Sequence, residues 1–287
     1  MQALFGQLLI GLINGAFYAM LSLGLAVIFG LLNIINFTHG AQYMMGAFCA
    51  WFLLNKAGVG YWWALLLAPI AVGAIGILIE RTMLARLYKL DHLYGLLLTF
   101  GLALIIQGLF RNEFGSSGLP YQIPSELTGG VNLGFMFLPI YRAWVIAASL
   151  VVCFSTWYVI ERTKLGSYLR AATENPTLVQ AFGVNVPRMI TLTLGFGVAL
   201  AALAGVMAAP IYQVNPLMGA DLIIVVFAVV VIGGMGSILG AILTGFGLGV
   251  IEGLTKYFYP EASNTVIFVA MVIVLLFRPA GLFGRER

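Results

Sequence analysis

ERTKLGSYLRAATENPTLVQAFGVNVPR, residues 161–188, is the longest polar stretch of the chain and lies between two long apolar runs. It carries four basic residues against two acidic ones, Glu161 and Glu174. In a chain as apolar as this one, connections rich in Lys and Arg lie on the cytoplasmic side of a membrane. We therefore expect residues 161–188 to form a cytoplasmic loop, and this placement orients the rest of the chain.

The same loop has the pattern of short helices rather than of a flexible linker. Leu165, Leu169 and Ala172 recur at helical spacing among polar residues. Asn175-Pro176 interrupts the pattern and is typical of the start of a new helix, because Asn caps helices and Pro fits their first turn. The pattern predicts a structured loop that presents a surface to a partner.

The composition excludes a soluble domain. Hydrophobic residues make up 62% of the 287 residues and charged residues only 8%, whereas about a quarter of the residues in a soluble domain are charged. The apolar segments are continuous runs without the alternation of β-barrel strands. The sequence therefore predicts an all-α polytopic membrane protein. The net charge of +4 is spread over loops and ends, which indicates membrane orientation rather than nucleic-acid binding.

Sites for catalysis, metals or nucleotides are not indicated. Cys49 and Cys153 both lie inside apolar runs, so neither a disulfide nor a metal site is expected. The glycines after Gly233 lack the Lys-Ser/Thr pair of a phosphate-binding loop. His39 and His92 have no plausible nucleophile or acid as a partner in the sequence. We expect no cofactor on this chain and no enzymatic activity of its own.

Nine apolar segments could cross or enter the membrane: residues 8–30, 41–54, 61–79, 93–110, 141–160, 189–210, 222–235, 238–257 and 265–277. Segment 41–54 is short, because a spanning helix needs about 20 residues, and it follows a polar break at residues 33–40. A broken or re-entrant helix is the alternative there. We expect eight to ten transmembrane or re-entrant helices, with the C-terminus in the cytoplasm and the side of the N-terminus open.

Basic residues are distributed unevenly in this topology, as the positive-inside rule requires. The inner side receives Arg81, Arg86, Lys89, Arg162, Lys164, Arg170, Arg188, Arg278, Arg285 and Arg287. The outer side receives Lys56, Arg111, Arg142 and Lys256. Loop 111–139 is rich in Gly, Ser and Pro and is expected outside, as a docking or lid surface.

Small residues mark two close-packing faces. Gly11, Gly15, Ala19 and Ser22 follow one another at spacings of three and four, and the run GGMGSILGAILTGFGLGVIEG, residues 233–253, repeats glycine at i,i+4. Such spacings let helix backbones approach closely in a membrane. We expect both segments to pack inside the bundle.

Polar residues within apolar segments are costly and are often functional. For Asn14, Gln107 and Glu252 the simpler interpretation is hydrogen bonding across the bundle, and Lys256 stands four residues after Glu252, where the two can pair. His39 is interpreted as a turn-stabilising residue, with a proton carrier as the alternative.

Two polar breaks share a pattern. NFTHGAQ, residues 36–42, and NPLMGAD, residues 215–221, both read Asn-x-x-x-Gly-Ala-polar, and each follows a helix rich in small residues. In the predicted topology they face opposite sides, as in inverted repeats whose broken helices meet at a transport pathway. The candidate pathway residues are Asn36, His39, Gln42, Asn215 and Asp221.

Four strings carry a family resemblance: IINFTHGAQYMMGAF (34–48), RAATENPTLVQAFGVNVPR (170–188), GGMGSILGAILTG (233–245) and LLFRPAGLFG (275–284). In this order they resemble the permease subunits of ABC importers for branched-chain and neutral amino acids. Such loops have an EAA pattern followed by a glycine; here Arg170-Ala171-Ala172 replaces Glu-Ala-Ala. The resemblance implies contact with the ATPase through Arg170, Ala171, Ala172, Glu174, Asn175, Pro176 and Gly183.

The resemblance also implies the surroundings of the chain. Residues 1–287 would form one permease domain in the bacterial inner membrane, paired with a homologous second permease. Two ABC ATPase subunits would carry ATP and Mg, and a periplasmic binding protein would deliver the substrate. Urea, short amides or aromatic acids are alternative cargoes. An ion-coupled secondary transporter is a further alternative, for which Asp221 and Glu252 would be the candidate ion-site residues.

Overall fold

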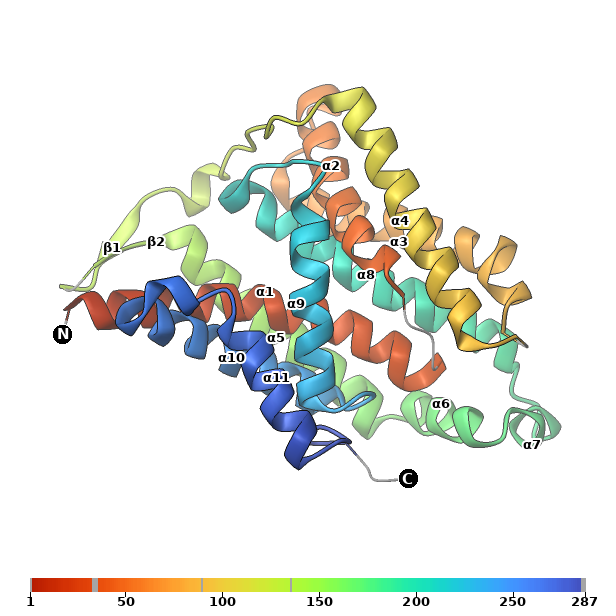
Figure 1. The fold of residues 1–287 in the computed structure, drawn as a ribbon. Coiled ribbons are helices and arrows are strands. Elements are labelled where there is room, and N and C mark those ends of the chain that lie inside the picture. Colours follow the sequence, from red (N-terminus) through yellow and green to blue (C-terminus); the bar gives the residue numbers. More distant parts are fainter. Residues whose placement is uncertain (1, 33–35, 89, 135, 285–287) are drawn as a thin grey trace.

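A computed structural model of the protein describes residues 2–32, 36–88, 90–134 and 136–284, and these form a bundle of helices (Figure 1). The helices are α1 (Gln2–Leu32), α2 (Thr38–Ala57), α3 (Tyr61–Thr82), α4 (His92–Phe114), α5 (Ile140–Arg162), α6 (Lys164–Glu174), α7 (Pro176–Ala181), α8 (Val186–Tyr212), α9 (Met218–Gly233), α10 (Ile238–Phe258) and α11 (Val266–Phe277). Short 3-10 turns are η1 (Leu84–Arg86), η2 (Ser125–Leu127) and η3 (Pro260–Ala262).

All nine predicted apolar segments are helical, but their number as membrane spans is smaller than expected. Among the described residues, six helices are long and apolar enough to cross a membrane: α1, α3, α4, α5, α8 and α10. Helices α9 and α11 are shorter apolar helices, and α2 has 20 residues but is not among the six. The expected count of eight to ten transmembrane or re-entrant helices is therefore not confirmed.

Helices α1 and α10 pack against each other through small residues, as the two glycine-rich patterns predicted. A Cβ added at Gly249 would overlap the carbonyl oxygen of Gly11, and one at Gly245 would lie 2.6 Å from the Cα of Ala19. The hydroxyl of Ser22 donates to the carbonyl of Ala241 at 3.3 Å. The close-packing prediction is confirmed, because the two backbones touch where side chains are smallest.

Helices of the first and last thirds contact each other in matching pairs. If α1, α2, α3 and α4 are matched with α8, α9, α10 and α11, most contacts come in equivalent pairs. Helix α1 packs on α10 and α8 packs on α3; α2 packs on α8 and α9 packs on α1. Helix α2 contacts α4, and α9 contacts α11. Helix α2 also packs on α3 as α9 packs on α10, and the pairs α1 with α8 and α2 with α9 join equivalent helices. The series α1–α4 and α8–α11 therefore share most of their internal and mutual packing, although α10 contacts α11 more closely than α3 contacts α4.

Two sequence expectations about irregular segments need correction. Helix α2 begins at Thr38, inside the predicted break at residues 33–40, because the side chain of Asn36 accepts a hydrogen bond from the Thr38 amide at 3.1 Å and starts the helix; residues 33–35 lie outside the described part of the chain. Loop 111–139 begins later than expected, because α4 continues to Phe114, and it contains a short antiparallel hairpin, β1 (Gly130–Asn132) and β2 (Phe137–Pro139). The predominantly helical structure agrees with the predicted all-α membrane protein.

Candidate functional site

The two matched polar breaks adopt the same backbone form. In the first, Asn36 accepts from the amide of Thr38. In the second, the side chain of Asn215 accepts from the amide of Leu217 at 2.9 Å. Both asparagines thus form the same local turn with the residue two positions on, and each turn leads into a helix, α2 or α9.

The glycines at the same place in the two motifs meet. A Cβ added at Gly219 would overlap the carbonyl oxygen of Gly40, and a Cβ added at Gly40 would lie 2.5 Å from the carbonyl oxygen of Gly219. The two backbones are too close for a side chain at either glycine, so α2 and α9 contact each other at their first turns. The structure therefore brings together two segments that the sequence relates only by a pattern.

The polar side chains of the first motif satisfy one another inside the bundle. Asn36, Thr38 and Gln42 are all buried. The Asn36 amide donates to the Gln42 oxygen at 3.3 Å, the Gln42 amide donates to the Thr38 hydroxyl at 3.1 Å, and that hydroxyl donates to Asn36. This closed network holds the entry to α2 in one conformation.

His39 is buried and points to the neighbouring helix α1. Its Nε2 lies 3.0 Å from the carbonyl oxygen of Leu21, and its Nδ1 has no partner among the described atoms. A Cβ at Gly24 would come within 2.9 Å of the imidazole. The contact with α1 agrees with the interpretation of His39 as a structural residue at this turn.

The second motif is more open than the first. Asn215 is half-buried, and Asp221, in the first turn of α9, is exposed. No described side chain forms an ion pair with Asp221. The preceding residue Val214 pairs with Leu119 of loop 111–139 through two backbone hydrogen bonds of 2.8 and 2.9 Å. The second motif is thus tied to the long loop that contains the hairpin.

A buried carboxylate joins three helices at one end of the bundle. Glu252 of α10 accepts from the Tyr18 hydroxyl at 2.7 Å and from the Asn14 amide at 3.3 Å. Lys256, one turn further on, forms an ion pair with it, so the predicted pairing is confirmed. Tyr212 of α8 donates to Asn14 at 2.9 Å. The cluster closes α1, α8 and α10 onto one another.

A second buried carboxylate, Glu80, was missed by sequence reasoning. It lies at the end of α3 and accepts from the Thr191 hydroxyl of α8 and from the Tyr88 hydroxyl, each at 2.8 Å. Burial, followed by the hydrogen bond to Glu80, raises the pKa of Tyr88 above its ordinary value. Glu80 stands where an apolar run changes to the basic stretch before α4, and no pattern in the sequence distinguishes it from an ordinary residue of a polar connection.

Segment 161–188 forms two short helices, as predicted. Helix α6 ends at Glu174, and Asn175 caps α7 by accepting from the amide of Leu178 at 2.9 Å. Pro176 occupies the first turn of α7. Gly183 has φ +85°, a conformation that side chains disfavour, and its amide bonds to the carbonyl of Gln180 at 2.9 Å to end α7.

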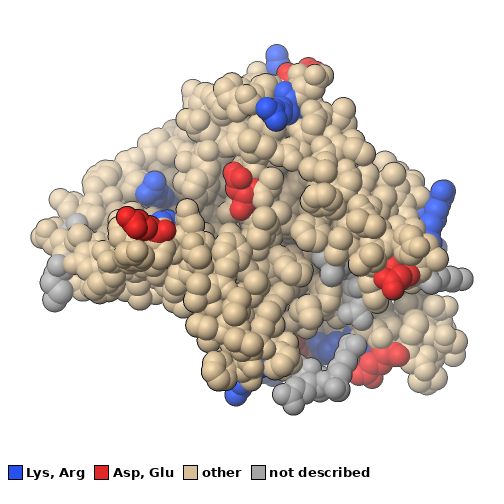
Figure 2. Space-filling model, in the orientation of Figure 1, with Lys and Arg blue, Asp and Glu red and all other residues tan. Residues whose placement is uncertain are grey.

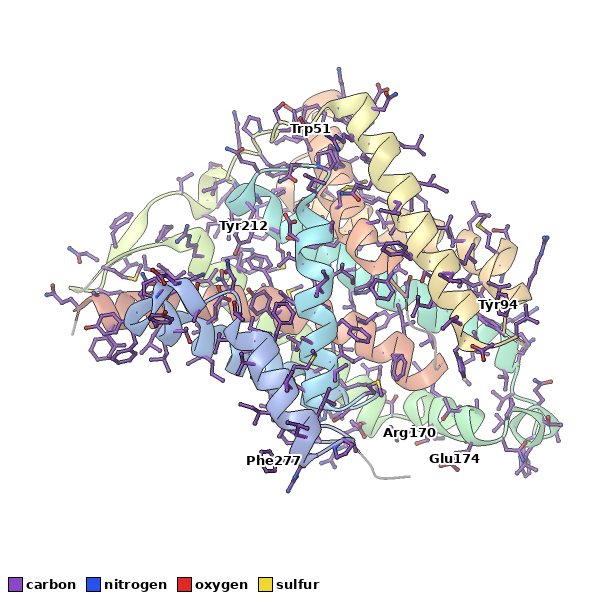
Figure 3. The ribbon with its side chains drawn as sticks, viewed as in Figure 1. Trp51, Tyr94, Arg170, Glu174, Tyr212 and Phe277 are labelled. Atoms are coloured by element: carbon purple, nitrogen blue, oxygen red, sulfur yellow. The ribbon has the colours of Figure 1, made fainter. Side chains whose placement is uncertain are left out.

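The α6–α7 unit is attached to α5 and leaves apolar side chains exposed. Arg170 donates to the carbonyl oxygen of Ile160 at 2.9 Å and lies 3.4 Å from the Glu161 carboxylate. Figure 3 labels Arg170 and Glu174 on α6, at the end of the bundle away from the hairpin. Leu165, Leu178 and Phe182 are exposed, Phe182 by 79%. Ala171 is exposed and Ala172 half-buried.

Few charged side chains lie on the face drawn in Figure 2, and most of them are near its edges. Within the described ranges, no group of three or more His, Cys, Asp or Glu residues is placed to hold a metal ion. The site features of this chain are thus two matched turns, two buried carboxylates and an exposed helical unit.

Comparison with known proteins places these features in a family. The profile described as "Branched-chain amino acid transport system / permease component" matches residues 7–276. No solved structure matches the chain.

Relatives match over nearly the whole length of this chain. The chain is 31% identical to the high-affinity branched-chain amino acid transport system permease protein BraD of Pseudomonas aeruginosa, over 97% of this chain and 95% of the relative. It is 30% identical to LivH of Escherichia coli K12, with the same coverage. It is 29% identical to LivM of Escherichia coli K12, over 94% of this chain and 68% of the relative. The chain belongs to the family of permease components of branched-chain amino acid transport systems.

Proposed function

We propose that this chain is the membrane-spanning subunit of an ATP-driven ABC importer for branched-chain or other neutral amino acids. The observation that carries the proposal is the α6–α7 unit, a pair of short helices with exposed apolar side chains in a member of a family of membrane permeases. Exposed apolar patches with a polar rim are typical of interfaces with other proteins. ATP and Mg belong to two separate ATPase subunits in this proposal.

The α6–α7 unit is built to pass movement into the bundle. Arg170 binds the last turn of α5, and a Cβ at Gly166 would overlap the carbonyl oxygen of Ile160, so α6 and α5 are in direct backbone contact. Helix α8 begins at Val186, three residues after Gly183. A push on Phe182 or Glu174 would therefore reach two spanning helices without an intervening flexible segment.

The basic residues of this unit support its placement on the cytoplasmic side of the bacterial inner membrane, with the C-terminus on the same side. Arg278 fits this placement, and Lys89, Arg285 and Arg287 lie outside the described residues. The hairpin-containing loop 111–139 then faces the periplasm. We propose that the binding protein docks there, and that a homologous permease pairs with this one in the membrane, as LivH and LivM of one organism are both permeases by name.

The matching helix contacts support an inverted repeat, α1–α4 with α8–α11. Its two turns, with Asn36, His39 and Gln42 on one side and Asn215 and Asp221 on the other, meet at Gly40 and Gly219. We place the translocation pathway beside this meeting point, since inverted-repeat transporters bind substrate near the repeat interface. Urea, short amides or aromatic acids remain alternative cargoes of the same architecture.

Reconstitution tests the proposal. The chain is purified from its native membrane with its bound subunits, and ATP hydrolysis is measured with candidate binding proteins loaded with leucine, urea or acetamide. We expect co-purified ATPase subunits and a second permease, and stimulation by a binding protein loaded with a neutral amino acid. A chain that purifies alone and moves substrate down an ion gradient would overturn the proposal.

Charge reversal tests the coupling unit within the same complex. Glu174→Arg is expected to abolish substrate-stimulated hydrolysis while the amount of assembled complex in the membrane stays unchanged. Glu261→Arg is the matched control, because Glu261 is also exposed but lies in η3, next to the C-terminal end of α10. Unchanged stimulation in Glu174→Arg would remove Glu174 from the coupling surface.

A further inference from the structure

A groove of about 280 Å³ opens between α2, α4 and α9. Its back wall is the crossing of the two matched turns, formed by Gly40 and Ala41 on one side and Gly219 and Ala220 on the other. These four residues have almost no side chains, so the crossing leaves space in front of it that larger residues would fill. The groove therefore exists because the two turns carry the Gly-Ala pair.

Helix α4 spans the front of the groove between two aromatic attachments to α2. In its N-terminal half, Phe100 packs edge-on against Phe37, the residue before α2, with ring centroids 6.1 Å apart. At its C-terminal end, Phe110 and Phe114 both pack on Phe48 with ring centroids 4.8 Å apart. The part of α4 between the attachments, with Ala103, Leu104 and Gln107, faces the open space.

Aromatic rings form part of the groove wall. Phe37 lies between Phe100 of α4 and Phe227 of α9, whose ring it stacks on at 6.1 Å with an interplanar angle of 25°. Both Phe37 and Phe100 line the groove. A ligand in the groove would therefore contact the rings of Phe37 and Phe100.

The lining fits a small molecule with an aliphatic body and a polar end. The volume is near the lower end of small-molecule sites, which measure roughly 300–1,000 Å³. Met44, Leu104 and Ile223 supply apolar walls, and Gln107 is the polar side chain among the lining residues. Asp221 follows the lining residue Ala220 in the first turn of α9 but does not itself line the groove. It is exposed and has no ion-pair partner among the described side chains.

We propose that this groove is a substrate site that takes the branched aliphatic side chain of a neutral amino acid, with Gln107 and Asp221 receiving its charged end. The proposal rests on the proposed transport function and adds the place and chemistry of recognition within the membrane. A carboxylate suits the ammonium group, and the Gln107 amide offers both a donor and an acceptor. Apolar walls distinguish leucine, isoleucine and valine from polar amino acids by burying their side chains.

Protection of an introduced cysteine tests the site directly, without relying on transport. Ala103→Cys is introduced into the full complex together with Cys49→Ser and Cys153→Ser, and its labelling rate with a water-soluble maleimide is measured. Leucine at ten times its dissociation constant should slow labelling roughly tenfold, because about nine-tenths of the sites are then occupied. Serine at the same concentration should slow it far less.

The matched control is Ser117→Cys, three residues after the end of α4. Ser117 is exposed and lies outside the helix, so it should be labelled, and leucine should not change its labelling. Adding Asp221→Asn to the Ala103→Cys complex should weaken the protection by leucine and leave labelling without leucine unchanged.

The outcomes separate this proposal from the transport function. A complex that transports leucine but shows no protection at Ala103→Cys would overturn the site and leave the function standing. Ala103→Cys that stays unlabelled with and without leucine would show a groove filled by lipid or by the second permease, and would also overturn it. Loss of transport by the unsubstituted complex would instead count against the function.

Discussion

The turn before α2 and the turn before α9 share a backbone form but differ in what their side chains do. Around Asn36 the polar groups are buried and bonded to one another, whereas around Asn215 the turn is half-buried and the acid at its end, Asp221, is exposed. The same sequence pattern thus forms a buried hydrogen-bonded turn before α2, whereas before α9 it leaves the Asp221 carboxylate exposed. In this chain, a shared motif indicates shared geometry and not a shared role.

The two buried carboxylates repeat this contrast. Glu80 of α3 binds α8, and Glu252 of α10 binds α1, so each occupies the third helix of its series and contacts the first helix of the other. Glu252 has Lys256 as an ion-pair partner, whereas the partners described for Glu80 are two hydroxyls. We expect the Glu252 cluster to be the more rigid of the two contacts.

The largest effect is expected where the two halves touch. Gly219→Leu would push a side chain into the backbone of Gly40 and should destabilise the complex by about 3 kcal/mol or more, the upper range of overpacking. Thermal melting of the detergent-solubilised complex and its yield by size-exclusion chromatography measure this. Gly108→Leu, which meets open space, should melt near the unsubstituted complex. Equal melting of both variants would show that the crossing is looser than the structure has it.

Replacing each asparagine compares the stability of the buried turn before α2 with that of the half-buried turn before α9. Asn36→Leu leaves the Thr38 amide and the side-chain oxygen of Gln42 without their buried partner, and should cost about 2–3 kcal/mol. Asn215→Leu removes one bond at a half-buried turn and should cost about 1 kcal/mol. Both should reduce transport without affecting docking of the binding protein. A larger drop in melting temperature for Asn215→Leu than for Asn36→Leu would contradict this prediction, because the turn before α9 would then contribute more to stability.

Replacing Glu252 or Glu80 with the neutral residue glutamine compares the contributions of the two buried carboxylates to stability. Glu252→Gln leaves the Lys256 ammonium without its counter-charge and should cost about 2 kcal/mol. Glu80→Gln keeps an acceptor for one hydroxyl and offers an NH2 donor to the other, which can rotate to accept it, and it should cost less than about 1 kcal/mol. Adding Lys256→Met to Glu252→Gln should recover part of the loss, and no recovery would mean that the ion pair contributes little to the cluster.

The smallest effect is expected at Tyr88. Tyr88→Phe removes one hydrogen bond to Glu80 and should cost about 1 kcal/mol. Because the pKa of Tyr88 is raised in the fold, its contribution is present below the ordinary tyrosine pKa of about 10 and is lost as pH rises above it. The melting difference between the two proteins should therefore shrink in alkaline buffer. A difference that is constant with pH would rule out the bond to Glu80 as its source.

The sequence by itself determined the membrane class, the positions of all nine apolar helices and the internal structure of segment 161–188. These features depend on local physics. Continuous apolarity specifies helices in lipid because every backbone group must be bonded within the segment, and Asn175 and Pro176 start α7 through contacts within three residues. The Glu252–Lys256 pair, one helical turn apart, could be predicted for the same reason.

Only the tertiary structure decided which distant residues meet. The bond between Glu80 and Thr191 joins residues 111 positions apart, and Gly40 and Gly219 touch because α2 and α9 cross there. The groove depends on this crossing and on aromatic contacts that hold α4 in front of it. Such contacts are set by how ridges and small-residue gaps of separate helices fit together, and hydrophobicity along one segment carries no information about the partner it will fit.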